Sequence, residues 1–220
     1  MNGVRKMRII NFDVRQFNNL KNDQWMLGNN ILYKMCLDYP LHNNPEEICA
    51  KIWLIGRSYA ASIERRTIKK HINDDFYDYV VQEFIKFNHR NNFDKKLKII
   101  KADGFNKQNL ERILSLHKEL TMFFKKLTGK EKRSLASKYL HFHCQLFPIY
   151  DSRAKNSINS IVKGKVEHTK GDEEYENFCN KMLFFYNFIK KETGKTPSLR
   201  QIDNYLVVVA NNKLNHKYKN

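Results

Sequence analysis

The sequence predicts an all-α protein, and three observations support that fold class. Apolar residues recur every three or four positions along most of the 220-residue chain. No segment with strand-like alternation is long enough to build a sheet. The chain holds only 8 Gly and 4 Pro, too few for a turn-rich β-sandwich, while its 41% of hydrophobic residues is enough for a sizeable core.

Four helices are predicted in the first half of the chain. Leu27 and Ile31 share one face of the first, and Pro45 stands in the first turn of the second, where proline is favoured. Asp74-Asp75 caps the third, and Gly104 precedes the fourth. These helices are expected over 24–38, 45–66, 75–90 and 107–126.

Four more helices are predicted in the second half. Thr128-Gly129 interrupts the pattern before the fifth helix, and Pro148 ends the segment that follows it. Asp151 or Ser152 caps the sixth, and Thr196-Pro197-Ser198 leads into the eighth. These helices are expected over 131–143, 152–162 and 173–192, with the last one starting at 199.

The charge balance points to an anionic partner. With 40 Lys and Arg against 23 Asp and Glu, the formal net charge is +17, and such an excess favours nucleic-acid binding. The alternative is a merely basic surface that reflects the composition of an AT-rich genome. No stretch has the length of a signal peptide or membrane span, which predicts a cytoplasmic, nucleoid or nuclear protein with no membrane partner. Four widely spaced cysteines fit reduced thiols and exclude an iron–sulfur loop or zinc ribbon: Cys36, Cys49, Cys144 and Cys179.

One segment, Leu127 to Arg153, combines features that suit nucleic-acid chemistry. It reads as a short turn between two helices, then an apolar crossing, then a lone carboxylate, Asp151, at a helix start. A turn at a helix N-terminus presents free backbone N–H groups that can bind a phosphate. Lys130, Lys132 and Arg133 surround that turn and complete the anion site.

This segment resembles the hairpin of the helix-hairpin-helix superfamily of DNA glycosylases, which includes endonuclease III and the adenine and oxidised-guanine glycosylases. The family hairpin reads roughly L-P-G-V-G-x-K-T-A, and a V-D-[ST]-H-V motif with the catalytic aspartate follows. Aligned without a gap, Leu127 and Gly129 match the first Leu and Gly, Ser134 matches the Thr, and Asp151 matches the aspartate. The resemblance implies a two-lobed monomer, with 1–45 and 151–220 in a terminal lobe and 46–150 in a central lobe that carries the hairpin (127–143).

The departures from the family pattern shape the expected reaction. Thr128 replaces Pro, and Glu131 replaces the second Gly. Arg133 stands where bifunctional members carry a Schiff-base lysine, and a guanidinium is not an amine nucleophile. The resemblance therefore implies a monofunctional enzyme that releases a base without cutting the strand. Lys138, about one helical turn further on, is the alternative nucleophile.

The implied substrate is a damaged, mismatched or modified base in double-stranded DNA, whether the role is repair or antiviral defence against modified phage bases. Asp151 is the expected catalytic carboxylate, because breaking an N-glycosidic bond develops positive charge on the sugar. The alternative is that Asp151 serves only as an ordinary helix N-cap. A flipped base also needs a pocket lined by aromatic or polar side chains. The expected pocket residues are Tyr150, Tyr59, Trp53 and Glu64, and the expected DNA contacts are Gly129, Lys130, Lys132, Arg133, Ser134, Lys138 and Arg153.

Small residues interleave with large ones in 51–66, which suits close helix packing or approach of a ligand. For Glu64 the alternative role is a helix-surface ion pair with an arginine.

His141 and His143 flank Phe142 and point apart on a helix, so each is expected in the core or in a groove. We expect no metal and no cofactor.

Two rival functions remain open. Arg66 to His71 forms an R-x4-H string, which resembles the active-site motif of helical ribonucleases of the higher-eukaryote-and-prokaryote nucleotide-binding superfamily. Thr67 departs from that family's pattern. The other rival is a non-enzymatic basic helical DNA-binding protein, in which the hairpin binds phosphates and Asp151 only caps a helix.

Overall fold

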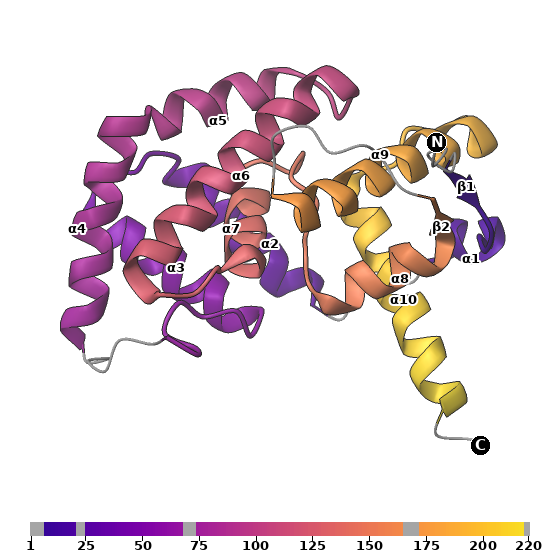
Figure 1. The fold of residues 1–220 in the computed structure, drawn as a ribbon, viewed down its shortest axis with the longest axis horizontal. Helices are drawn as coiled ribbons and strands as arrows, with labels where there is room; N and C mark the ends of the chain where they lie inside the picture. The colour runs from indigo at the N-terminus through magenta and orange to yellow at the C-terminus, as the bar shows by residue number, and fades with distance from the viewer. Residues whose placement is uncertain (1–6, 21–24, 68–73, 165–171, 218–220) are drawn as a thin grey trace, which may run out of the picture.

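The computed structural model describes residues 7–20, 25–67, 74–164 and 172–217, and it confirms the all-α class. Figure 1 shows the chain as packed helices with one small strand pair. Over the described ranges the elements are β1 (Arg8–Ile9), α1 (Val14–Asn18), α2 (Met26–Asp38), α3 (Pro45–Ser58), α4 (Asp74–Asn91), α5 (Phe93–Ala102), α6 (Lys107–Thr128), α7 (Arg133–His143), α8 (Ser152–Ile161), β2 (Val162–Lys163), α9 (Glu173–Thr193) and α10 (Leu199–Lys217).

The helices gather in two groups along the long axis of the molecule. Helices α3 to α7 lie at one end, and α8, α9, α10 and the strand pair lie at the other (Figure 1). Helix α2 packs against α3 and α7, and α8 packs along α10. β1 pairs antiparallel with β2, which ties the N-terminal segment to the end of α8. One continuous cluster of buried hydrophobic side chains runs through both groups.

Helix α6 shows how the periodic pattern builds this core. Its residues Ile113, Leu120, Phe124 and Leu127 are spaced at three, four or seven positions and are all buried, so they form one stripe that packs inward. The helix ends at Gly129, whose φ of 74° is the left-handed conformation that glycine adopts without strain. None of the described helices is long and apolar enough to cross a bilayer.

The predicted helix over 45–66 is wrong at its C-terminal end, because α3 stops at Ser58. Ala60 has a φ of 49°, its N–H bonds to the carbonyl of Arg57, and the N–H of Ala61 bonds to the carbonyl of Gly56 at 2.8 Å. These are the two hydrogen bonds of a Schellman cap, which turns the chain back. The apolar spacing continues past Ser58 because Ile63 is also buried. Periodicity alone therefore cannot distinguish a helix that continues from a turn that buries the next apolar residue.

Two opposite substitutions test this turn. A Cβ on Gly56 would lie 2.9 Å from the backbone Cα of Ser62, so we expect Gly56→Ala to lower the free energy of unfolding by about 1–3 kcal/mol. Ala60 has a left-handed backbone conformation that disfavours a side chain. Ala60→Gly should therefore raise the free energy of unfolding by up to about 1 kcal/mol. Urea denaturation measures both, and a stabilising Gly56→Ala would contradict the turn.

The sequence prediction also missed two helices, the short α1 and α5. Helix α5 follows α4 after one residue, Asn92, whose φ of 52° is left-handed. Its buried stripe consists of only Phe93, Leu97 and Ile100, which is too short a pattern to stand out beside α4. The buried ring of His42 fixes this corner, because its Nδ1 lies 2.5 Å from a carboxylate oxygen of Asp94. The segment that carries the R-x4-H string lies outside the described residues from 68 onward.

Candidate active site

The segment between α7 and α8 is pinned to α7, and this fixes the position of Asp151. The hydroxyl oxygen of Ser137 accepts a hydrogen bond from the N–H of Tyr150 at 3.0 Å. One turn along the same helix, Nδ1 of His141 lies 2.8 Å from the carbonyl oxygen of Phe147. Because residues four apart share a helix face, the chain crosses that face and starts α8 beside it.

Asp151 makes two different contacts with its two carboxylate oxygens. Oδ1 accepts a hydrogen bond from the N–H of Ala154 at 2.9 Å, so Asp151 is the N-cap of α8. Oδ2 lies 3.3 Å from Nζ of Lys138, whose side chain is 3% exposed, while that of Asp151 is 35% exposed. Nζ of Lys138 also donates to the hydroxyl of Ser134 at 2.9 Å. The result is an oriented carboxylate beside a buried ammonium, still within reach of solvent.

Tyr59 covers the other side of this ammonium. Nζ of Lys138 lies 5.5 Å from the centroid of the Tyr59 ring, within cation–π range. The Tyr59 hydroxyl donates to Oδ1 of Asn29 at 2.7 Å and accepts from Arg200 at 3.1 Å. Burial opposes the charge of Arg200, but Asp203 and Tyr59 raise its pKa above the ordinary value. Tyr59 therefore links α2 and α10 to the Asp151–Lys138 pair.

The turn between α6 and α7 ends at a residue whose side chain does not cap α7. The N–H of Gly129 closes α6 on the carbonyl of Lys125, and the hydroxyl of Thr128 accepts from the N–H of Lys130 at 3.2 Å. The N-cap of α7 is Lys132, and its side chain makes no capping hydrogen bond. The first-turn amides of α7 are thus not capped by that residue, and such amides suit an anion.

Cations from two segments lie near one another at this turn, and we call Arg66, Lys130 and Lys132 the turn cluster. The ammonium of Lys132 donates to the carbonyl of Arg65. Burial lowers the pKa of Lys132, and Arg66 and Lys130 lower it further against the opposing effect of Glu64. Like charges held this close repel each other, so the cluster suits a polyanionic ligand.

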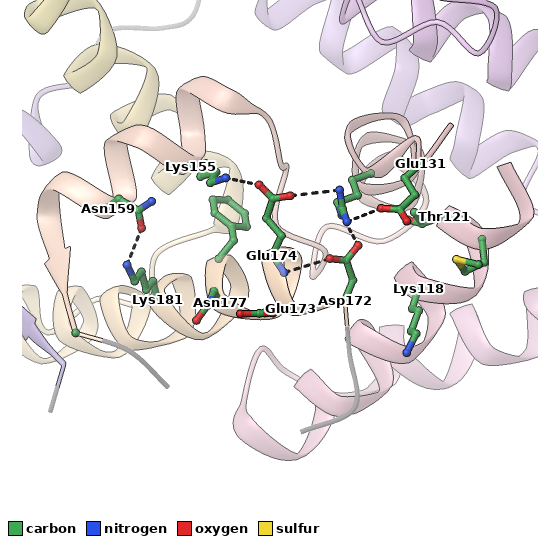
Figure 2. A pocket seen from close by; sticks show the side chains of 14 residues that line it. Lys118, Thr121, Glu131, Lys155, Asn159, Asp172, Glu173, Glu174, Asn177 and Lys181 are labelled. Atoms are coloured by element: carbon green, nitrogen blue, oxygen red, sulfur yellow. Dashed lines mark hydrogen bonds and ion pairs between the residues drawn. The ribbon is translucent and has the colours of Figure 1, made fainter. Parts of the chain in front are cut away.

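Arg133 lies in a different environment from the turn cluster. Its guanidinium pairs with Glu131 at 2.5 Å, with Asp172, and with Glu174 at 3.2 Å. Burial opposes its charge, but these carboxylates raise its pKa above the usual value. The network lines a cavity of about 570 Å³ between α6, α8 and α9 (Figure 2). The Arg133 guanidinium, which the sequence predicts to contact phosphate, is therefore paired with three carboxylates.

Tyr150, a predicted base contact, packs into the core beside α9. It is 8% exposed, and its ring centroid lies 5.2 Å from that of Phe178. Burial and a hydrogen bond with Glu174 raise its pKa. Of the four predicted pocket residues, it is Tyr59 whose ring lies against Lys138.

The remaining predicted residues lie at the surface or in ion pairs. Trp53 is 47% exposed on α3. Glu64 pairs with Arg57 at 2.5 Å and accepts from the hydroxyl of Tyr77 at 2.7 Å, so the ion pair expected as its alternative role is present. Arg153 is exposed in the first turn of α8, two residues beyond the Asp151 cap, where a phosphate can reach it.

The two histidines of α7 are buried. Nε2 of His141 lies 2.6 Å from the hydroxyl of Tyr33, and burial lowers the pKa of His141 to about 4. The neutral ring donates from Nδ1 to the carbonyl of Phe147 and accepts from Tyr33 at Nε2. Among the described residues, no three His, Cys, Asp or Glu side chains are grouped to hold a metal ion.

Buried histidines predict an acid-sensitive fold. Burial lowers the pKa of His42, His117 and His141 to about 4, whereas each ring has its ordinary pKa near 6.5 in the unfolded chain. Between these values the unfolded chain binds more protons, so stability falls as pH drops from 6.5 toward 4. Each histidine contributes up to about 1.4 kcal/mol per pH unit. Urea midpoints at pH 7, 6 and 5 check this, and equal midpoints would contradict it.

Sequence reasoning missed Asn29 and Arg200. Asn29 is 6% exposed on the face of α2 that also buries Leu32 and Cys36. A polar side chain in such a stripe needs a partner, and this is the signal by which Asn29 is recognisable. For Arg200 the signal is weaker, because an arginine in the first turn of a helix gives no indication that its side chain is mostly buried.

Comparison with known proteins gives no counterpart for this site: no protein-family model, curated protein or solved structure matches the chain. A function is therefore inferred from the Asp151–Lys138 pair, the turn cluster, and the side chains around them.

Proposed function

We propose that the protein is a DNA glycosylase that hydrolyses the N-glycosidic bond of a damaged, mismatched or modified base in double-stranded DNA. The observation that carries the proposal is the contact of Asp151 with Lys138. It places a partly exposed carboxylate against α7, the helix that begins at the turn cluster. A cap alone explains the contact with Ala154 but gives no reason for a buried lysine beside the other oxygen.

The chemistry needs one carboxylate near the sugar. As the bond from C1′ to the base nitrogen breaks, the base leaves with the electron pair, and positive charge grows on the deoxyribose. Asp151 stabilises that charge and orients a water molecule, whose oxygen bonds to C1′. The proton lost by the water passes to solvent through the carboxylate, and the departing base takes up a proton.

The turn cluster binds the phosphates of the DNA strand. Lys132 caps α7 and Lys138 follows six residues later in it, which separates them by about 9 Å along the helix axis. A phosphate held at the turn therefore leaves a neighbouring nucleotide within reach of Asp151. In this arrangement DNA lies across the surface where α7 and α8 begin. The flipped nucleotide approaches the exposed side of Asp151.

Lys138 is assigned a positioning role in this reaction. An ammonium in an ion pair has no lone pair with which to attack C1′, and Arg133 is engaged by three acids. The reaction is therefore hydrolytic and leaves an intact strand with an abasic site. Lys138 holds the second carboxylate oxygen and so keeps Asp151 in place.

A panel of duplexes, each with one modified or mismatched base, tests the reaction. Strand breaks should appear only after mild alkali, which cuts abasic sites. Sodium borohydride should trap no protein–DNA adduct. Breaks without alkali, together with an adduct that Lys138→Gln abolishes, would contradict the hydrolytic mechanism and make Lys138 the nucleophile.

The same panel separates the rival functions. A non-enzymatic binding protein retains every duplex without releasing a base. A ribonuclease cuts single-stranded RNA, and His71→Ala removes that activity while Asp151→Asn does not. Either result would replace the glycosylase proposal.

A further inference from the structure

The inference concerns a group of cations at the far end of α8, and it rests on the proposed function because it names a second contact with the same DNA. Helix α8 begins at its cap, Asp151, and leads directly into β2, which lies beside β1 at the edge of the molecule (Figure 1). Its 10 residues, at about 1.5 Å each, give it a length of about 15 Å. The helix therefore connects the proposed catalytic carboxylate to the strand pair.

Helix α8 has one buried side and one open side. Helix α10 packs along it, and its buried residues are Ala154, Ser157, Ile158 and Ile161. Arg153 and Asn156 are exposed, and residues three apart lie on one face of a helix. From Ser152 to Gly164 the sequence contains no aspartate or glutamate. A phosphodiester chain can therefore lie along this face without meeting a carboxylate of the helix.

Two cations lie directly opposite each other on the strand pair. Arg8 and Lys163 are partners in the antiparallel register, and both are exposed. Their neighbours Ile9 and Val162 pack against the core, so the two cations point to solvent. Like charges at directly opposite positions of a strand pair repel each other. An anion bound between them relieves that repulsion.

A third cation, Lys181 of α9, lies close to this pair. Its Nζ donates to Oδ1 of Asn159 at 2.6 Å. Burial lowers the pKa of Lys181, the charge of Lys163 lowers it further, and no carboxylate of the described chain offsets these effects. Lys181 and Asn159 also line one part of the 570 Å³ cavity, next to Gly164. Cations from β1, β2 and α9 thus gather where α8 ends.

We propose that Arg8, Lys163 and Lys181 form a second phosphate-binding site, and that the DNA runs from Asp151 along α8 to reach it. One strand of a duplex carries a phosphate about every 3.4 Å of the axis, so the length of α8 corresponds to about four or five base pairs. The second site therefore contacts the DNA about that far from the flipped nucleotide, and on one side of it only.

Binding of three duplexes, each with one tetrahydrofuran abasic analogue, tests the position of this site. One duplex has the analogue at its centre, and the other two end about three base pairs beyond it, on one side or on the other. Arg8→Gln combined with Lys163→Gln should raise the Kd of the central duplex about tenfold and lower its salt slope by about 0.9 for each lost phosphate contact. The same variant should change the Kd of one truncated duplex less than about twofold, because that duplex no longer reaches the site.

The matched control removes the same charge elsewhere. Lys95→Gln combined with Lys98→Gln, on the exposed side of α5, should leave all three affinities within about twofold of the wild-type values.

A charge reversal separates binding from folding. Lys163→Glu places a carboxylate opposite Arg8 and close to Lys181, so it should raise the urea midpoint of the free protein. It should also weaken binding of the central duplex more than Lys163→Gln does, because the carboxylate repels phosphate. A lysine that served only the fold would lose stability on substitution, so a lower midpoint with unchanged binding would overturn the proposal.

Failure of this site and failure of the glycosylase function give different results. If the double variant weakens all three duplexes equally, or behaves like the α5 control, the second phosphate site is overturned, while base release by the wild-type protein still supports the glycosylase. If the wild-type protein releases no base but the double variant discriminates between the duplexes as described, the second site stands and the catalytic proposal fails.

Discussion

Replacing Asp151 with asparagine is expected to slow base release by about 10²–10³-fold or more, with DNA affinity within about twofold of the wild-type value. Asparagine caps helices about as well as aspartate, so the N-cap bond to Ala154 persists and α8 starts at the same residue. The substitution removes only the negative charge that faces Lys138 and the proposed sugar site. Single-turnover kinetics and a binding titration measure the two effects separately.

Asp172 provides the matched control for this variant. It is also a helix N-cap, with its carboxylate 3.1 Å from the N–H of Glu174, and it also pairs with a cation, Arg133. Asp172→Asn removes a capping charge of the same kind away from the proposed chemistry and should leave base release within about twofold. Equal losses in the two variants would indicate a structural effect, and an active Asp151→Asn protein would remove this carboxylate from the mechanism.

Neutralising the turn cluster should weaken binding rather than chemistry. Lys130→Gln combined with Lys132→Gln is expected to raise the Kd for duplex DNA about tenfold at moderate salt. It should also lower the slope of log affinity against log salt by about 0.9 for each phosphate that the protein no longer neutralises. Rates at saturating protein should stay near the wild-type value, because the double variant leaves Asp151 and Lys138 in place. Titrations at several salt concentrations provide the measurement.

The control has the same change in net charge at another site. Lys95 and Lys98 are exposed on α5, at the outer edge of the molecule in Figure 1. Their double replacement by glutamine should leave the salt slope near the wild-type value. If both double variants weaken binding equally, net charge alone drives association and the turn is not a specific phosphate site.

Much of the fold was predictable because long amphipathic helices leave a clear periodic signal. Helices α6 and α9 were predicted to within two residues at each end. The prediction failed where a short or interrupted pattern mattered, at α1, at α5 and at the end of α3. The Schellman cap at Ala60 has no glycine to reveal it, since the residue in the left-handed conformation is an alanine.

The candidate site was predictable only in part. The spacing between the hairpin and Asp151 is local in the sequence, so the segment could be singled out. The contacts that complete it come from residues far apart in the chain. Tyr59 and Lys138 are 79 positions apart, and Arg200 reaches Tyr59 across 141 positions. Arg133 was predicted to contact DNA, but carboxylates engage it instead. Its partners Asp172 and Glu174 lie at the cap and in the first turn of α9, where a local motif cannot reveal them.

The most direct test is mass spectrometry of the small molecules freed when the protein is incubated with the duplex panel. A free base should appear in one or more reactions, in equal amount to the abasic sites counted in the same DNA. It should be missing when Asp151→Asn protein is used. Duplexes that stay tightly bound while every base remains attached would show that this carboxylate and its lysine partner serve the fold and not a reaction.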